Sequence, residues 1–353
     1  MRVTRLGLLG LLLAGLAGSG VYAQEGEDGV RELPPHVSPA TVRAIDRGVA
    51  WLAKNQLRDG SFGEAGGGGG YGVYPTAMSA LAGMAFLGHG DTPSRGRYSE
   101  KVRRIMTFLL DPRHASRTGL ITASGEESRS MYGHGFGTMF LACCLGEELD
   151  GATETRVRQV LGRAVELIGK SQSGAGGWLY TPDSQGDEGS VTVTQVQALR
   201  ACRNAGISVP LTVIRRAVSY IEKSQNQDGG IAYNAMGGPS RPALAAAGAA
   251  VLYNAGQYDS PAARKCLQFC KRTIKITDRN GHWYYTHLYL AQAYWQVGGD
   301  DWGRYYPQVR DFLLRSQASD GSWQGDGVGK VYGTSIAVTI LSLPFERVPL
   351  YMR

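Results

Sequence analysis

A single unit recurs along this chain. A helix-like stretch ends near a glutamine, a turn with glycine follows, and an apolar residue then leads into a helix rich in small side chains. The three best-kept copies are Gln56, Asp59, Gly60 and Phe62; Gln225, Asp228, Gly229 and Ile231; and Gln317, Asp320, Gly321 and Trp323. A repeated unit buries its core by stacking on its neighbours, so the repeat constrains the fold more than any single segment does.

Three weaker copies complete the series. One keeps Gln172, Gly176, Gly177 and Trp178 but lacks the aspartate, and we take Gly177 as its turn glycine. The other two keep only the turn, at Gly119 and Gly281. Because a helix precedes and follows each turn, the pattern predicts six units of two helices each. The glutamine and aspartate side chains are interpreted as structural, since they can satisfy backbone groups where one helix ends and the next begins.

The two helices of a unit differ in their apolar pattern. Ser38 and Pro39 mark the start of the first helix, which then carries one apolar stripe through Ile45 and Leu52. Residues 76–87 are apolar around almost the whole circumference, as expected for a helix that is covered on all sides. Each unit therefore pairs an outer helix with an inner one, and six pairs can either stack as an open solenoid or close into a ring.

The first copy is specific enough to suggest a family. Its residues Arg47, Gly48, Trp51, Gln56 and 59–62 resemble the QW repeat of squalene-hopene and oxidosqualene cyclases. The same repeat is loosely kept in prenyltransferase/squalene oxidase repeat proteins and in protein prenyltransferase β subunits. The resemblance covers about residues 38–345 and implies an all-α fold, the α6/α6 toroid of six helical hairpins. It implies much less about chemistry, because one fold hosts several functions.

The N-terminal residues indicate export. Arg2 and Arg5 precede an apolar stretch over residues 6–21 and a small-residue site that ends at Ala23, which is typical of a cleaved secretory signal. We expect a signal peptide at 1–23, a flexible linker at 24–37 and one toroid domain at 38–353, in a periplasmic or secreted bacterial protein. An uncleaved membrane anchor is the alternative, and the sequence contains no second candidate span.

The charge of the chain limits the kinds of partner that it can bind. The net charge of +7 is mild, and the paired arginines at 103–104 and 215–216 fall on predicted outer helices among acidic residues. This pattern indicates a solvated face and no nucleic-acid partner.

The chain has five cysteines, so at least one of them cannot form a disulfide within the chain. We interpret them as buried thiols, with a bridge from Cys202 to Cys143 or Cys144 as the open alternative.

Candidate site residues lie where the inner helices begin, since these starts rim one mouth of a toroid. The ligand-binding candidates are Tyr132, His134, Arg241, Tyr284, Tyr285, His287 and Tyr332. His134 and His287 are the weak catalytic candidates, and each has a structural alternative: a hydrogen bond to a neighbouring turn for His134, and packing on an inner helix for His287.

Arg241 precedes Pro242 at a helix start, where the helix dipole disfavours a cation. This position favours an anionic partner, and two kinds are considered. One is a ligand, and the other is an acidic side chain of the loop that contains Asp183, Asp187 and Glu188.

Known signatures of the resembling families are missing. The chain has no Asp-any-Asp-Asp motif of the kind that supplies the cyclase acid. In the fourth unit, the positions that match a prenyltransferase zinc ligand are residues 240–243, and none of them can bind zinc. In the fifth unit, His287 lies two residues away from the matching position. Neither a metal nor another cofactor is expected, and the glycine run 66–70 lacks the lysine of a phosphate loop.

Two functions remain after this comparison. The first is an exported protein that binds an apolar small molecule or a peptide in the toroid cavity. The second is a divergent terpenoid-cyclase-like or prenyl-transfer enzyme, in which His134, His287 or an acidic residue at the mouth would transfer a proton. An enzyme acting on glycans is a further alternative, and the sequence identifies no protein partner.

Overall fold

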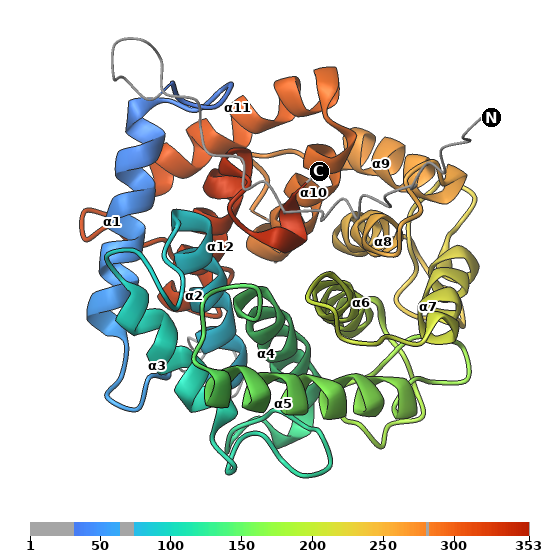
Figure 1. The fold of residues 1–353 in the computed structure, drawn as a ribbon. Coiled ribbons are helices and arrows are strands. Elements are labelled where there is room, and N and C mark those ends of the chain that lie inside the picture. The colour runs from blue at the N-terminus through green and yellow to red at the C-terminus, as the bar shows by residue number, and fades with distance from the viewer. Residues whose placement is uncertain (1–31, 64–73, 280–281, 353) are drawn as a thin grey trace, which may run out of the picture. The chain divides into compact units, whose positions relative to one another are not determined.

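The computed structural model describes residues 32–63, 74–279 and 282–352 (Figure 1). The turn glycine Gly281 lies outside the described residues. The chain divides into two units, residues 1–34 and residues 35–353, and every described helix belongs to the second unit. No helix in the described ranges is long and apolar enough to cross a membrane.

Residues 35–353 fold as two concentric layers of helices. The six outer helices are α1 (Pro39–Asn55), α3 (Ser99–Leu110), α5 (Gly151–Lys170), α7 (Leu211–Ser224), α9 (Pro261–Thr273) and α11 (Gly299–Ser316). The six inner helices are α2 (Pro75–His89), α4 (Ser130–Cys144), α6 (Gly189–Asn204), α8 (Pro242–Asn254), α10 (Trp283–Val297) and α12 (Lys330–Ser342). Short 3₁₀ turns are η1 (Glu127–Arg129), η2 (Leu343–Phe345) and η3 (Pro349–Tyr351).

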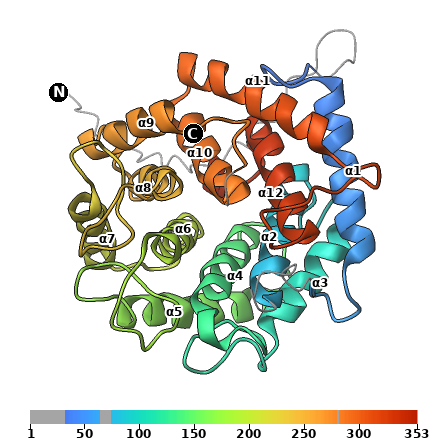
Figure 2. The same cartoon turned by 180° about the vertical axis from the view of Figure 1, so that it is seen from behind.

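Each inner helix packs on the next, and α12 packs on α2, so the inner layer is a closed ring (Figures 1 and 2). The described part of this unit contains no β-strand beyond isolated bridges. The predicted all-α, α6/α6 toroid of six helical hairpins is confirmed, and the open solenoid is wrong.

The two layers follow from their sequences. The Ser38 hydroxyl accepts a hydrogen bond from the Thr41 backbone N–H at 3.2 Å and caps α1, which buries one face that includes Ile45 and Leu52. In α2, every residue from 76 to 88 is buried. A helix of this kind is stable only inside a layer of other helices, which the outer ring supplies.

The repeated glutamine joins successive hairpins. Gln56 Nε2 donates to the Gly60 carbonyl in its own turn and to the Lys101 carbonyl at the start of α3, both at 3.0 Å. Gln317 Nε2 makes the equivalent pair of bonds, at 2.9 Å, to the carbonyls of Gly321 and of Ala44 in α1. The last repeat thus fastens the last hairpin to the first and closes the ring.

The repeat glycine allows this close approach. Gly60, Gly119, Gly176, Gly229 and Gly321 all have a positive φ, and a Cβ on any of them would meet a backbone carbonyl of the next outer helix. At Gly176, φ is +105°, and that Cβ would lie 2.3 Å from the Arg216 carbonyl oxygen. The third copy therefore aligns on Gly176, and the expected alignment on Gly177 is wrong.

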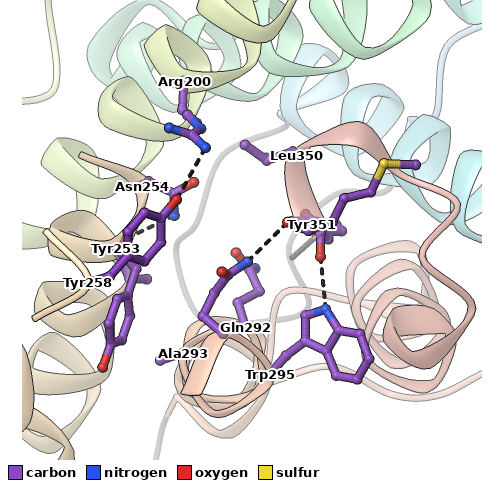
Figure 3. A pocket seen from close by; sticks show the side chains of 12 residues that line it. Arg200, Tyr253, Asn254, Tyr258, Gln292, Ala293, Trp295, Leu350 and Tyr351 are labelled. Carbon is purple, nitrogen blue, oxygen red and sulfur yellow. Dashed lines mark hydrogen bonds between the residues drawn. The ribbon is translucent and has the colours of Figure 1, made fainter. Parts of the chain in front are cut away.

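The C-terminal segment narrows the mouth at the C-terminal ends of the inner helices, where η3 packs on α6. Inside the ring, Gln197 Nε2 of α6 donates to Gln292 Oε1 of α10 at 2.5 Å, although α8 separates these two helices. Below this pair, the Trp295 indole donates to the Tyr351 carbonyl at 2.8 Å, and the C-terminal segment leaves a pocket of only about 20 Å³ (Figure 3). Open space in the ring is therefore found at the opposite mouth.

All five cysteines are buried free thiols. The interpretation as buried thiols agrees with this, and the alternative bridge to Cys202 is not formed. Burial raises the pKa of Cys143 and of Cys266 to about 12, which keeps both sulfurs protonated at neutral pH.

Candidate functional site

A cavity of about 680 Å³ opens at the mouth where the six inner helices begin. Residues from the first turns of these helices, or from the loops just before them, form its wall. The volume is within the range of small-molecule pockets, roughly 300–1,000 Å³. The fold therefore places one ligand-sized space at one end of the ring.

One group of lining residues is apolar and buried, and we call it the apolar floor. Its residues come from four inner helices and are Ala77, Met78, Leu81, Phe136, Leu244 and Leu288. All six are buried. This apolar floor can accommodate a hydrocarbon or aromatic group, because contact with such a group removes apolar surface of both partners from water.

Six tyrosines also line the cavity, one from each hairpin. They are Tyr74, Tyr132, Tyr180, Tyr233, Tyr285 and Tyr332, and all are half-buried. A tyrosine offers an apolar ring with a polar tip, so this tyrosine ring can contact both an apolar body and a polar group of one ligand. Tyr132, Tyr285 and Tyr332 lie where the sequence predicted them.

Tyr180 and Tyr233 were missed because they lie in loops and not at helix starts. Each follows the apolar residue of its repeat by two positions, Trp178 in one case and Ile231 in the other. That spacing was a usable signal. Their hydroxyls are hydrogen-bonded to each other at 2.5 Å, which joins the third and fourth hairpins at the wall of the cavity.

Glu188 is the buried carboxylate of the wall. It caps α6, accepting hydrogen bonds from the backbone N–H of Ser190 at 2.8 Å and of Val191 at 2.7 Å, and the Tyr132 hydroxyl donates to it at 3.2 Å. Burial raises the pKa of Glu188, and the bonds from Ser190 and Val191 partly oppose that rise. Its oxygens are thus already used by the protein.

Two arginines lie against the linked tyrosines. The Arg129 guanidinium carbon is 4.8 Å from the centre of the Tyr180 ring, and that of Arg241 is 4.8 Å from the centre of the Tyr233 ring. Both arginines line the cavity. Cation–π contact fixes where each guanidinium lies and leaves its N–H donors free for other partners.

His287 also lines the cavity, from the second turn of α10. Its Nδ1 is 2.8 Å from the Tyr305 hydroxyl, and its ring packs on Trp283 with 4.3 Å between ring centres. Burial lowers the pKa of His287 to about 3. The imidazole is therefore neutral at physiological pH and holds no acidic proton to give to a ligand.

His134 and Tyr284 do not reach the cavity wall. His134 is fully buried, and its Nδ1 accepts a hydrogen bond from the Ile121 backbone N–H at 3.2 Å. Burial lowers the pKa of His134 to about 4. Tyr284 is buried against Trp283, and its backbone N–H donates to the Asp326 carboxylate at 2.7 Å. The structural alternative for His134 therefore describes what the side chain does.

The described residues contain no group of three or more His, Cys, Asp or Glu side chains arranged to hold a metal ion. Of the seven predicted ligand-binding residues, the structure brings five to the cavity wall: Tyr132, Arg241, Tyr285, His287 and Tyr332.

Known structures share this fold. No protein-family model and no curated protein sequence matches the chain. The type II terpene cyclase MstE from Scytonema aligns with 13% identity over 88% of this chain and 100% of its own, with a TM-score of 0.60. A glycosidase in complex with glucose aligns with 12% identity, 90% and 100% coverage and a TM-score of 0.62.

An α-1,6-mannanase of Salegentibacter, in complex with a mannotetrose, is similar at 8% identity, 86% and 98% coverage and a TM-score of 0.62. At these identities the likeness establishes the fold alone. The chain is an α/α toroid, a fold that it shares with these structures, and any statement about its function must rest on its own side chains.

Proposed function

We propose that this protein binds an amphipathic small molecule in the cavity at the open mouth of the toroid. The observation that carries the proposal is the composition of the wall, which combines buried apolar side chains with one tyrosine from each of the six hairpins. A ligand with an apolar body and a polar end matches both kinds of side chain. The Scytonema cyclase, whose variant is described with the substrate geranylgeranyl dihydroxybenzoate, gives an example of such a ligand in this fold.

Binding is favoured over catalysis by the state of two titratable groups in the wall, Glu188 and His287. Glu188 is engaged as a helix cap, and His287 is neutral and paired with Tyr305. Neither can serve as a proton donor without breaking a contact that positions it. A divergent cyclase or prenyl-transfer enzyme remains the alternative, and conversion of a polyprenyl substrate by the purified protein would establish it.

Filling the cavity tests the proposal. Ala243 lies in the wall and is half-buried, so Ala243→Trp fills the space with little disturbance of the core. Ala152→Trp on the exposed start of α5 is the matched control. We expect Nile red, a neutral apolar dye, to bind the wild type and the control but not Ala243→Trp. Equal binding to all three proteins would refute a ligand site in this cavity.

Export is part of the same proposal and has its own test. A signal peptide over residues 1–23 predicts that the protein isolated from the envelope fraction of a bacterial host starts at Gln24. N-terminal sequencing or intact mass measures this directly. A mass that retains residues 1–23 would support the membrane-anchored alternative.

A further inference from the structure

We propose that the ligand of this cavity carries an oxyanion, a carboxylate or a phosphate, which binds at the wall formed by Arg129, Tyr180, Tyr233 and Arg241. The inference rests on the proposed function and names the chemistry of the ligand's polar end. Its starting observation is that neither guanidinium has an ion-pair partner among the described residues, although both border a cavity.

The protein's own acids are committed elsewhere. Asp187 accepts hydrogen bonds from the Ser173 hydroxyl at 3.3 Å and from the Ala235 backbone N–H at 3.2 Å. Glu188 caps α6. The helix start favours an anionic partner for Arg241, either a ligand or this acidic loop. The described structure shows no ion pair from Arg241 to the loop, and the exposed guanidinium borders the cavity, where an anionic ligand can reach it.

The two arginines hold the same position in alternate hairpins. Arg129 is the N-cap residue of α4, and Arg241 is the N-cap residue of α8. Neither side chain caps its helix, and the partial positive charge of a helix N-terminus disfavours a cation there. A bound anion would offset the unfavourable placement of both arginines, because helix N-termini and guanidinium groups both attract oxyanions.

The tyrosines connect the two arginines into one surface. Each guanidinium lies on one tyrosine ring, and the Tyr180 and Tyr233 hydroxyls are hydrogen-bonded to each other. Among the described charged residues of the cavity wall, the cations are Arg129, Arg241 and Lys275, and the acids are Glu188 and Asp278. With the Glu188 carboxylate occupied by backbone donors, the open part of the wall favours an anion.

The apolar floor completes the ligand class. An oxyanion at this wall leaves the rest of the ligand to extend toward Met78, Leu81 and Phe136. The class is therefore a single-headed anionic amphiphile, such as a fatty acid or an alkyl phosphate.

The test compares head groups on a constant tail. Dodecanol, dodecanoate and dodecyl phosphate are titrated as competitors of Nile red, the two anions below their critical micelle concentrations and dodecanol below its solubility limit. We expect both anions to bind the wild type at least tenfold more tightly than dodecanol, with a preference that falls as salt is raised. Comparing dodecanoate with dodecyl phosphate identifies which oxyanion the wall prefers.

Variants assign the preference to the arginines. The double variant Arg129→Gln/Arg241→Gln is expected to bind the anions no more tightly than it binds dodecanol. The single variants then show how the preference divides. Arg215→Gln, on the exposed face of α7, is the matched control and should keep the full preference. Gln keeps much of the length and hydrogen-bonding capacity but not the charge, which limits effects on folding.

The outcomes separate the two proposals. If neither Nile red nor dodecanol binds, the proposed function itself fails. If both bind but wild type does not distinguish the anions from dodecanol, or the double variant retains the preference, the ligand site stands and the oxyanion inference is overturned.

Discussion

The Ile121 backbone N–H donates a hydrogen bond to His134 Nδ1 at 3.2 Å. In three other hairpins a hydroxyl of the inner helix accepts the same bond from the residue after the repeat turn. Phe62 donates to Ser79, Trp178 to Thr192 and Trp323 to Thr334, at 3.0 to 3.1 Å. His134 therefore takes the place of a repeat hydroxyl, which explains why a histidine at a helix start is buried away from the cavity.

Replacing this acceptor should destabilise the fold without changing ligand binding. His134→Leu leaves the buried Ile121 N–H without a partner, which costs about 1–3 kcal/mol of unfolding free energy. His134→Asn keeps an acceptor oxygen at a similar position and should lose less. Urea unfolding measures both variants, and equal losses for Leu and Asn would contradict the role assigned to the hydrogen bond. Loss of Nile red binding in folded His134→Asn would show that His134 contributes to the ligand site.

The same histidine should make stability depend on pH. Its pKa is about 4 in the folded protein against 6.5 normally, so between these values the unfolded chain binds the additional proton. Unfolding free energy should therefore fall as pH is lowered from 6.5 to 4, by roughly 3 kcal/mol from His134 alone. His287, with a pKa of about 3, acts in the same direction.

The control for this experiment is His134→Asn, measured over the same pH range. The pKa values of the buried carboxyls Glu126, Glu188 and Asp326 are raised chiefly by burial, so these groups favour the folded state at low pH and oppose the histidines. Both proteins carry them, so the difference between the two curves isolates His134. Parallel curves for wild type and variant would show that His134 is not buried in its neutral form.

The fold could be predicted because its signal is local and repeated. Gln56, Gln225 and Gln317 each stand beside a turn whose geometry the same residue types produce three times. The alignment of the third copy could not be predicted. Gly176 and Gly177 are adjacent, and only the structure shows which one takes the positive φ beneath Arg216.

The site was only partly predictable because successive helix residues point about 100° apart. Tyr285 lines the cavity while its neighbour Tyr284 is buried against Trp283, and no residue type distinguishes the two. Tyr180 and Tyr233 lie in loops, where helical periodicity gives no information, and only their constant spacing from the apolar residue of the repeat marks them. Arg241 was found from the sequence because a cation at a helix start is unfavourable, a cost that is independent of the tertiary structure.

A glycine with a positive φ should tolerate alanine better where no neighbouring helix lies close to it. Gly229 and Gly256 have nearly the same φ, +89° and +82°, so alanine strains both backbones similarly, by about 1–2 kcal/mol. A Cβ at Gly229 would lie 2.6 Å from the Lys265 carbonyl oxygen, whereas nothing lies within 4 Å at Gly256. Gly229→Ala should lower the unfolding free energy by about 1–3 kcal/mol more than Gly256→Ala. Similar losses would mean that α9 yields easily to the added methyl group.

The cysteines should not react with thiol reagents until the protein unfolds. All five are buried, and burial raises the pKa of Cys143 to about 12, so thiolate is scarce and shielded in the folded state. A thiol reagent at pH 7.5 should find five reactive sulfhydryls in denaturant, and reaction in native buffer should be slow and limited by unfolding. Three or fewer in the denatured protein would reveal a disulfide, with Cys202 to Cys143 or Cys144 as the first pairing to examine.

Closure of the ring depends on the final repeat. Gln317→Leu removes the amide that bonds the carbonyls of Ala44 and Gly321, and Gln225→Leu removes its counterpart between α7 and α9. Each should cost about 1–2 kcal/mol of unfolding free energy. Gln308→Leu is the control, because its amide bonds only the Arg304 carbonyl on the exposed face of α11.

The two glutamine variants should differ in where the fold loosens. Hydrogen exchange should accelerate at α1 and α11 in Gln317→Leu, and at α7 and α9 in Gln225→Leu, because a lost fastening exposes only the helices that it joined. Even acceleration of exchange around the ring in Gln317→Leu would contradict this expectation. It would mean that the contact between the last and first hairpins belongs to one cooperative unit, in which each repeat turn contributes to the stability of all six hairpins.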